Sequence, residues 1–347
     1  MRRVLLTVDP ELPVPPLGYG GIERIADFLA RELRSRGLIV GLVAVAESKA
    51  PVTQLFSWPA KSPRTISSHL RNLIALSGAV RDFQPDVVHS FSRLGYLLPL
   101  LPRSIPKIMS YQRYTGGKQI RIASALGGRS LAFAACSDFI AEMGRPWGGN
   151  WHVIHNFTDT GYFDFTPEVT SDAPLLFLSR VERIKGVHIA IEIALAAKRR
   201  LVIAGNRLDT AEGRKYWETC VAPHLSNQLV TYVGEVDDSQ KRDLLRSAAA
   251  LLVPIEWNEP FGIVFVEALA CGTPVISRAR GALPEIVRHG IDGFLIEGLE
   301  DGRQAVERIG EISRASCRER AETLFSVAVA VDNYLSLYQE LISRMRR

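Results

Sequence analysis

Short apolar runs rich in β-branched residues alternate with amphipathic stretches of helical period along most of the chain. The apolar runs predict strands, and the amphipathic stretches predict helices. Strands are predicted at residues 4–8, 39–45, 86–90, 106–110, 131–136, 175–179, 201–204, 229–233, 250–253 and 274–276. Helices are predicted at residues 22–36, 65–83, 118–127, 186–197, 211–223, 238–247 and 262–271, and from Glu319 to the C-terminus. This alternation is typical of parallel sheets with helices on both faces.

A polar segment from Asp159 to Pro174 separates two such series of strands and helices. The chain has 347 residues, which exceeds the ~250–300 residues over which one core usually extends. We therefore predict an α/β protein with two Rossmann-like doubly wound domains, at residues 1–163 and 164–327. The final helix, at about residues 328–347, is expected to pack back on the first domain. The domains would face each other across a cleft, with ligands outside the carboxyl ends of the strands.

The composition is that of an ordinary globular protein, with 47% apolar and 23% charged residues. No apolar run approaches the ~20 residues that span a bilayer. The start MRRVLLTVDP imitates a signal peptide, but its apolar core is only Val4 to Val8, so a first strand is expected. The scattered cysteines form no C-x-x-C pair and are expected to be buried apolar groups, which fits a reducing cytoplasm.

Positive charge gathers in the first half of the chain. Residues 1–165 hold 19 Lys and Arg against 12 Asp and Glu, whereas the remainder holds 23 against 25. A basic half could attract anionic lipid headgroups or a phosphorylated acceptor. A solvated surface explains the same excess equally well.

The stretch WNEPFGIVFVEALACGTPVI, from Trp257, places Glu259 just before a predicted apolar helix and Glu267 about two turns inside it. The apolar residues of this helix form a core stripe, which leaves the two carboxylates unexplained, because such groups need partners beside an apolar run. The first N–H groups of a helix lack helical acceptors. Free N–H donors and two carboxylates suit a polyhydroxyl ligand that carries a phosphate.

A second candidate is the glycine-rich segment that contains Gly18, Gly20 and Gly21, between a strand with a proline-rich loop and a helix. Such glycines let backbone N–H groups approach a phosphate at a helix N-terminus. The segment does not match G-x-G-x-x-G, because Glu23 stands three positions after Gly20, and this disfavours dinucleotide binding. A tight strand–helix turn is an equally good interpretation.

Arg180 follows the predicted strand LLFLS, and Lys185 precedes the next helix. Two cations at the end of one strand can both reach a diphosphate, although solvated charges are the commoner outcome. The loop GEVDD after a later strand could hold a nucleobase, but capping of the next helix by Asp237 or Asp238 is the favoured interpretation. His89 and His155 are lone histidines, which are more often structural groups than ligands.

Together these segments resemble family 4 of the retaining glycosyltransferases, which have the two-domain GT-B fold. The resemblance covers nearly the whole chain. GYGGIE is similar to the glycine-rich donor loop, DVVH to a strand of the first domain, and IHNFTD to the interdomain turn. SRVERIKG is similar to the phosphate-binding segment, EPFGIVFVE to the Glu-x7-Glu element, and GALPEIV and HGIDGFL to the usual tail.

The resemblance implies a role for each matched residue. Arg180 and Lys185 would bind the diphosphate of the donor, with Gly20 and Gly21 closing on it from the other domain. Glu267 would hold the ribose hydroxyls. The remaining implied donor contacts are Glu259 and the N–H groups of Phe261, Gly262 and Ile263 at the transferred sugar, and Val236 and Lys241 at the base.

The chain departs from the family at two places. Where many members have a histidine after the third cleft strand, this chain reads SYQRYTGG, with Gln112, which can hydrogen-bond a hydroxyl but cannot titrate. The usual Asn-Gly of the interdomain turn is Asn156-Phe157 here. His89, Gln112 and Arg113 are the acceptor-side candidates. The cations expected to favour an anionic or lipid-linked acceptor are Arg93, Arg113, Lys118 and Arg121.

The expected activity is transfer of a sugar, with retention, from a nucleotide diphosphate sugar to a hydroxyl of a glycan, lipid-linked or small-molecule acceptor. The resemblance implies no metal and no cofactor besides this donor. A cytoplasmic protein that contacts the inner face of the membrane through its basic first domain is expected, without nucleic acid as a partner. A nucleotide-sugar epimerase and a non-catalytic nucleotide-sugar-binding protein stay open as alternatives, and an NAD-dependent oxidoreductase is disfavoured.

Overall fold

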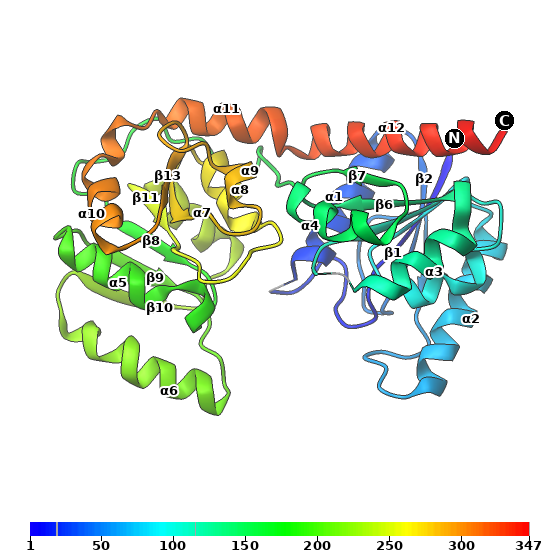
Figure 1. The fold of residues 1–347 in the computed structure, drawn as a ribbon, viewed down its shortest axis with the longest axis horizontal. Coiled ribbons are helices and arrows are strands. Elements are labelled where there is room, and N and C mark those ends of the chain that lie inside the picture. Colours follow the sequence, from blue (N-terminus) through cyan, green and yellow to red (C-terminus); the bar gives the residue numbers. More distant parts are fainter. Residues whose placement is uncertain (19, 115, 347) are drawn as a thin grey trace. The chain divides into compact units, whose positions relative to one another are not determined.

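The computed structural model describes residues 1–18, 20–114 and 116–346. Tyr19 of the glycine-rich segment, Thr115 and Arg347 of the final helix lie outside these residues. The chain forms two compact units (Figure 1). Unit 1 comprises residues 1–156 together with the segment from residue 327 onward, and unit 2 comprises residues 157–326. The expected domain boundary after residue 163 falls inside unit 2.

Unit 1 is built on a seven-stranded parallel sheet with the order β3-β2-β1-β4-β5-β6-β7. Its strands are β1 (Arg3–Thr7), β2 (Ile39–Ala44), β3 (Gln54–Ser57), β4 (Val87–Ser90), β5 (Lys107–Tyr111), β6 (Leu131–Ala135) and β7 (Trp151–Val153). Its α-helices are α1 (Gly21–Ser35), α2 (Ile66–Phe83), α3 (Gly117–Gly127), α4 (Asp138–Gly144) and α12 (Val327–Arg346). Its 3-10 helices are η1 (Leu94–Leu100), η2 (Gly128–Ser130) and η3 (Arg145–Trp147).

Unit 2 has a six-stranded parallel sheet with the order β10-β9-β8-β11-β12-β13. Its strands are β8 (Leu175–Leu178), β9 (Leu201–Ala204), β10 (Val230–Gly234), β11 (Ala250–Leu252), β12 (Val275–Arg278) and β13 (Gly293–Ile296). Its α-helices are α5 (Val187–Ala196), α6 (Ala211–Cys220), α7 (Asp238–Ser247), α8 (Ile263–Ala270), α9 (Leu283–Ile286), α10 (Leu299–Glu307) and α11 (Arg314–Leu324). Its 3-10 helices are η4 (Arg183–Lys185), η5 (Ala222–Ser226) and η6 (Ile309–Glu311).

Each sheet reverses its winding direction once, between β1 and β4 in unit 1 and between β8 and β11 in unit 2. Because crossovers between parallel strands are right-handed, a reversal places the following helices on the opposite face of the sheet. In unit 2, α10 packs against α5, and α8 packs against α7 and α11. Both units are therefore doubly wound, and the predicted fold class is confirmed.

Every strand and helix predicted from the sequence is present, with ends shifted by a few residues. The helical stretch from Glu319 is two helices, since α11 ends at Leu324 and α12 begins at Val327. The unpredicted strands β3, β7 and β13 are short and lie at sheet edges. An edge strand of three or four residues carries too little alternation to be recognised by period.

The last helix, α12, belongs to unit 1, where it packs beside α1. Tyr334 and Tyr338 of α12 are buried. The Tyr338 hydroxyl lies 2.7 Å from Nδ1 of His89 on β4, and the Tyr334 ring packs 4.7 Å from the His89 ring between centroids. A helix remote in sequence thus completes the core of unit 1.

The prediction that His89 faces an acceptor is wrong. Its side chain is fully buried, and its second nitrogen, Nε2, lies 2.7 Å from the Ser110 hydroxyl. Both ring nitrogens are therefore bonded to protein hydroxyls, and burial lowers the pKa of His89 to about 3. The strand directs this residue into the core rather than toward a ligand.

Among the described residues, no helix is both long and apolar enough to cross a membrane. None of the four cysteines forms a disulfide in the described part of the chain, and Cys136, Cys271 and Cys317 are buried, as expected for small apolar groups.

The buried, neutral His89 makes a specific pH dependence of stability testable. In the unfolded chain His89 takes up a proton below about pH 6.5. In the folded chain it takes up this proton only below about pH 3. Its contribution is therefore complete above pH 6.5 and is lost as the pH falls. Between pH 7 and pH 5, the free energy of unfolding of the unmodified chain should therefore fall by about 2 kcal/mol more than that of the His89→Gln variant.

Urea unfolding at both pH values measures this difference. His69→Gln, at a half-buried histidine of the same unit, controls for the loss of any histidine. Parallel pH dependences of the unmodified chain and His89→Gln would contradict the assignment.

Candidate functional site

The winding reversal of unit 2 brings two loops to one edge of its sheet. β8 and β11 are hydrogen-bonded neighbours, and both run in the same direction. The loop after β8 carries Arg180 and Lys185, and the loop after β11 carries Glu259. Because the carboxyl ends of parallel strands share an edge, residues 74 positions apart along the chain meet there.

Lys185 and Glu259 form an ion pair at this edge. Lys185 Nζ lies 2.5 Å from Glu259 Oε2, and both side chains are largely buried. The same oxygen accepts a hydrogen bond of 2.9 Å from Nε1 of Trp257, whose ring centroid lies 4.7 Å from the Lys185 ammonium. The indole therefore holds both charged groups, by hydrogen bonding to one and by a cation–π contact with the other.

A close backbone approach fixes the Lys185 loop against the loop after β11. Gly186 has a φ of 77°, and a Cβ atom there would lie 2.1 Å from the Pro254 carbonyl oxygen. Next to this contact, the Glu256 N–H donates to the Ile184 carbonyl at 2.8 Å. Only glycine fits this position, because any side chain would force the two loops apart.

A second close approach fixes the backbone of Glu259. Gly281, in the loop after β12, has a φ of 61°, and a Cβ atom there would lie 2.2 Å from the Glu259 carbonyl oxygen. The Ala282 N–H donates to that oxygen at 2.9 Å. Three consecutive strands in space, β8, β11 and β12, thus supply loops that touch at Glu259.

The helix α8 begins directly after this carboxylate. Gly262 takes a left-handed conformation with φ 91° and precedes the first helical residue, Ile263. The Phe261 ring is buried and packs edge-on against Phe325, so this side chain belongs to the core. The first-turn N–H groups of α8 are directed away from the helix body beside Glu259. The residues Phe261, Gly262 and Ile263 are thus placed where backbone donors could hold an anion or a hydroxyl.

Glu267 lies on α8 and pairs with a different cation. Its side chain is nearly buried, and Oε1 lies 2.7 Å from Lys241 Nζ on α7. Lys241 also lies 3.4 Å from Asp238 and over the Phe163 ring, 5.2 Å from its centroid. The two glutamates of the Glu-x7-Glu element are therefore held by separate lysines.

The loop before α7 contains Val236 and Asp237. Asp237 caps α7, because its side chain accepts the Gln240 N–H at 2.8 Å and Gln240 Oε1 accepts the Asp237 N–H. The capping interpretation of this aspartate is confirmed. Val236 is half-buried beside the cap.

Arg180 follows β8 and pairs with Glu182 at 2.7 Å. All three cations expected to bind the donor thus have a carboxylate partner: Arg180 with Glu182, Lys185 with Glu259, and Lys241 with Glu267.

The candidates of unit 1 lie at the carboxyl edge of its own sheet. Gly20 precedes α1, and a Cβ atom there would lie 2.6 Å from Pro16 and 3.1 Å from a Glu23 carboxylate oxygen. Gly21 is the first residue of α1, and Gly18 has open space around its Cα. Glu23 is buried beneath this segment, and burial raises its pKa. The glycine segment therefore packs tightly at Gly20 and is open at Gly18.

Gln112 follows β5, and its buried Nε2 donates to no acceptor in the described part of the chain. Its neighbour Arg113 pairs with the buried Asp9 at 2.8 Å. Arg93 pairs with Glu11 and lies 3.9 Å from Asp9. Gln112 thus has an unused donor, whereas the two arginines are already compensated by acids.

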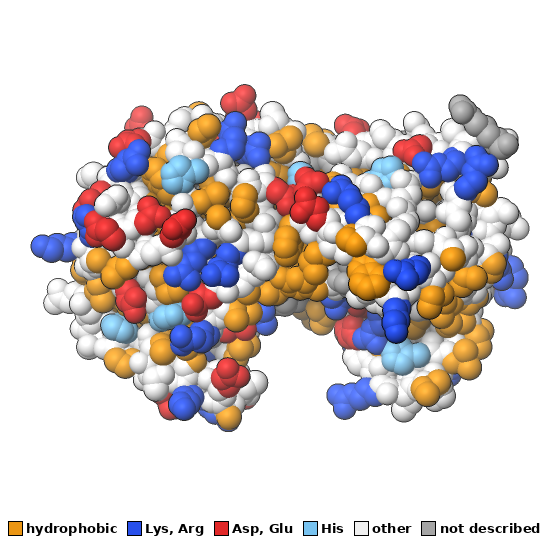
Figure 2. All heavy atoms as spheres, viewed as in Figure 1, with side chains coloured by type: hydrophobic (Ala, Val, Ile, Leu, Met, Phe, Trp, Pro, Cys, Tyr) orange, Lys and Arg blue, Asp and Glu red, His pale blue; other side chains and the backbone are white. Residues whose placement is uncertain are grey.

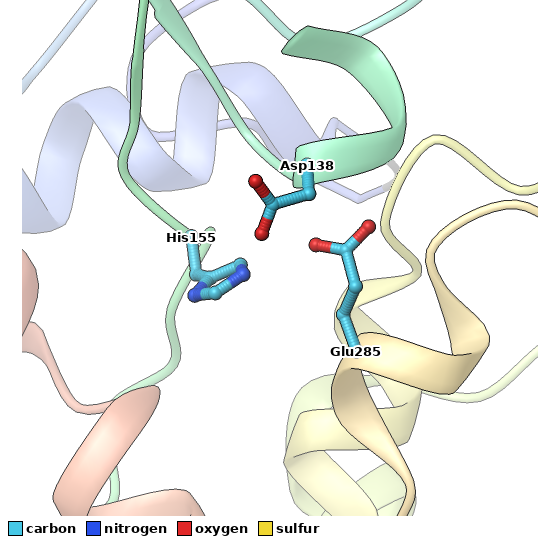
Figure 3. A group of neighbouring side chains, drawn as sticks. All are labelled: Asp138, His155 and Glu285. Atoms are coloured by element: carbon cyan, nitrogen blue, oxygen red, sulfur yellow. The ribbon is translucent and has the colours of Figure 1, made fainter. Parts of the chain in front are cut away.

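Figure 3 shows three side chains of types that bind metal ions: Asp138, His155 and Glu285. Asp138 and His155 belong to unit 1, and Glu285 belongs to α9 of unit 2. Within either unit this group offers at most two ligands, so we assign no metal to it. The expectation of a metal-independent reaction stays a prediction.

The sequence assigns no role to Trp257, Gly186 or Gly281, although each shapes the site. The sequence positions of the two glycines could have indicated a role. Gly186 directly follows Lys185 at a strand–helix junction, and Gly281 opens the segment GALPEIV. What they contact, however, lies on other strands and becomes visible only in the folded chain.

Two doubly wound units are the architecture of the GT-B glycosyltransferases, and solved structures of that class match almost the whole chain. AviGT4, a glycosyltransferase involved in avilamycin A biosynthesis, has a TM-score of 0.76 and 24% identity over 99% of this chain and 98% of its own. A glycosyltransferase from Rickettsia africae has a TM-score of 0.82 and 18% identity over 98% of each chain. HepE of Anabaena, in complex with UDP and glucose, has a TM-score of 0.74 and 19% identity over 98% of this chain and 100% of its own.

Two family models match in succession, Glycosyltransferase Family 4 at residues 19–162 and Glycosyl transferases group 1 at residues 162–323. The chain belongs to this family of glycosyltransferases.

Among relatives, D-inositol 3-phosphate glycosyltransferase of Mycolicibacterium smegmatis is 32% identical over 191 residues, 51% of this chain and 42% of the relative. D-inositol 3-phosphate glycosyltransferase 1 of Catenulispora acidiphila is 33% identical over 190 residues, 48% of this chain and 44% of the relative. Spore coat protein SA of Bacillus subtilis is 26% identical over 184 residues, 48% of each. The matched stretch thus covers less than half of each of these relatives.

The contact between Gly281 and the Glu259 backbone predicts a large effect of one methyl group. Gly281→Ala should lower the free energy of unfolding by at least about 3 kcal/mol, from left-handed strain plus the displaced backbone. Gly290→Ala is the matched control, because Gly290 has a φ of 77° but open space around it. It should cost only about 1–2 kcal/mol. Equal losses in chemical denaturation would contradict the proposed contact.

Proposed function

We propose that the chain transfers a sugar from a nucleotide diphosphate sugar to an acceptor hydroxyl, with retention of configuration and without a metal ion. The observation that carries this proposal is the Lys185–Glu259 pair beside the first turn of α8, at the winding reversal of unit 2. A cation, a carboxylate and helix N–H donors side by side suit a ligand that combines phosphates with hydroxyls.

Each glutamate keeps one oxygen for a ligand. Glu259 receives its hydrogen bonds from Lys185 and Trp257 on Oε2, and Glu267 receives that of Lys241 on Oε1. Within the described residues, the other oxygen of each carboxylate accepts no hydrogen bond. A sugar hydroxyl could donate to Glu259 and a ribose hydroxyl to Glu267, while each lysine keeps its glutamate in place.

The cations would act on the leaving group. As the bond from the sugar to the diphosphate breaks, negative charge grows on the phosphate and the sugar becomes oxocarbenium-like. Lys185 has three N–H donors, of which one is used by Glu259, so it can contact a phosphate without releasing the carboxylate. Arg180 would supply the second cation, and fixed charges of this kind typically contribute a few kcal/mol each to the transition state.

Retention would follow from attack on the face that the leaving group departs from. In this proposal the departing phosphate takes the proton of the acceptor hydroxyl, and no protein nucleophile forms a bond to the sugar. The cations Arg180 and Lys185 would provide the charge stabilisation that a divalent metal provides in other enzymes.

The relatives support the substrate classes. HepE was solved with UDP, with UDP and glucose, and with UDP-glucose, which supports a nucleotide diphosphate sugar as donor. Two relatives are named for D-inositol 3-phosphate, which supports an anionic acceptor. Gln112 and the exposed Lys118 and Arg121 would contact this acceptor from unit 1, with peripheral attachment to a membrane as part of the same proposal.

A binding screen of UDP, GDP, ADP and TDP sugars by calorimetry identifies the donor. Transfer to an acceptor then distinguishes this proposal from its rivals. An epimerase would convert the donor alone, and a non-catalytic protein would bind it without turnover.

Removing a leaving-group cation should slow the chemical step. Lys185→Ala and Arg180→Ala should each lower kcat by more than tenfold at saturating donor, because the phosphate charge loses a fixed partner. Lys215→Ala, at an exposed lysine of α6, is the matched control and should leave kcat unchanged. Unchanged turnover in the first two variants would refute the leaving-group role.

Glu259 should act on the sugar rather than on the nucleotide. Glu259→Gln keeps the side-chain size but removes the charge, so kcat should fall by more than tenfold while the Kd of the free nucleoside diphosphate changes by less than about threefold. Glu256→Gln, in the same loop, is the control. Normal turnover, or equal losses of nucleotide affinity and turnover, would contradict this assignment.

A further inference from the structure

Two long stretches of unit 1 contain cations and no acids. Residues 48–81 hold five Lys and Arg, and residues 87–137 hold seven, with no Asp or Glu in either stretch. The first stretch includes most of α2, and the second includes η1 and α3. These three elements are neighbours in the fold, since η1 contacts both helices. The acid-free sequence is therefore gathered on one part of unit 1.

The outer face of α2 is apolar where an amphipathic helix would be polar. Ile66, Leu70 and Ile74 recur at intervals of four residues, which places them along one stripe of the helix. They are 88%, 52% and 61% exposed, whereas the opposite stripe, with Asn72 and Leu76, is buried. A soluble surface helix normally presents polar groups on this face.

The neighbouring elements continue this pattern. Leu98 of η1 and Ile122 and Leu126 of α3 are each about half exposed. Lys118, Ile122 and Leu126 again follow the four-residue interval, so a cation extends the apolar stripe. Figure 2 shows hydrophobic side chains together with Lys and Arg over the region where α2 and α3 lie in Figure 1.

Several of the cations around these side chains have no acidic partner. Across the described parts of unit 1, the exposed cations on and beside α2, η1 and α3 that form no ion pair are Arg64, Arg71, Arg103, Lys118, Arg121 and Arg129. On unit 2, Arg303, Arg308 and Arg318 each pair with a glutamate one helical turn away, but among the described residues the exposed Lys198 and Lys215 form no ion pair either. What distinguishes the face of unit 1 is that its unpaired cations flank exposed apolar side chains.

We infer that this face, formed by α2, η1 and α3 and called here the α2–α3 surface, docks on an anionic lipid bilayer. Exposed isoleucines and leucines can enter the boundary between headgroups and acyl chains, and flanking cations can pair with lipid phosphates. A second copy of the chain fits the surface less well, because its own cations would be brought together. The inference rests on the peripheral attachment included in the proposed function and assigns a surface to it, but it does not depend on the transfer reaction itself.

Vesicle flotation of the full chain tests the inference without any donor. The probes are vesicles of phosphatidylcholine alone and vesicles with about one third phosphatidylglycerol, at low and high salt. The unmodified chain should float with the anionic vesicles and much less with the neutral ones. Failure to float with anionic vesicles would overturn the inference.

Two sets of variants separate the contribution of the apolar side chains to vesicle binding from that of the cations. Replacing Ile66, Leu70 and Ile74 together by Ser should weaken binding by more than tenfold at both salt concentrations. Replacing Arg71, Lys118 and Arg121 together by Gln should weaken it by about fivefold per residue at low salt and remove the preference for anionic lipid. Unchanged binding in either set would overturn the inference.

Ile291→Ser combined with Leu299→Ser is the matched control, because both residues are about half exposed on unit 2. This variant should bind as the unmodified chain does. If the unmodified chain is instead a dimer by light scattering and the α2 variant is a monomer, the surface joins two copies and the lipid assignment is wrong. Donor binding by the α2 variant, measured without vesicles, should be unchanged, so failure of the lipid test and failure of the proposed transferase activity are distinguishable.

Discussion

The site of unit 2 depends on two places where the backbone of one loop touches the backbone of another. Gly186 meets Pro254, and Gly281 meets Glu259, both at distances that no Cβ atom permits. These contacts draw the loops after β8, β11 and β12 together at the carboxyl edge of the sheet. The Lys185–Glu259 pair follows from them, because neither side chain could reach the other from loops held apart by a methyl group. Trp257 then needs only to lie beside the pair to hold it.

Compensated charge at this edge determines what kind of ligand can enter. Lys185 and Glu259 are largely buried, and so are Lys241 and Glu267, so each lone charge would carry a desolvation cost. A bare phosphate can accept the remaining N–H donors of a lysine, but it offers the free oxygen of the glutamate no donor. A ligand with both phosphates and hydroxyls offers the lysine an anion and the glutamate a donor. In the proposed function, this mutual compensation favours a nucleotide sugar over inorganic phosphate.

The sequence was sufficient for the central strands and for the order of the motifs, because buried parallel strands are continuous apolar runs. It could not supply the short edge strands β3, β7 and β13, which carry little pattern. It also could not pair Lys185 with Glu259, since a contact over 74 residues depends on strand order rather than on spacing. His89 was misplaced for a related reason. Its position at a strand end suggested a ligand, but its partner Tyr338 lies 249 residues away, on a helix that only the folded chain brings to β4.

Lysines and arginines are paired with acids in the site of unit 2 but are largely unpaired on the α2–α3 surface of unit 1. In the site of unit 2 each cation has a carboxylate, because partial burial makes an unpaired charge costly. On the α2–α3 surface the cations remain in water, where pairing contributes little, so the fold does not require acids beside them. Nor does the fold require Ile66, Leu70 and Ile74 to be apolar, since their stripe of α2 faces away from the core. Residues that stability leaves free to be polar, and that are nevertheless apolar and flanked by uncompensated cations, are best explained by something outside the chain.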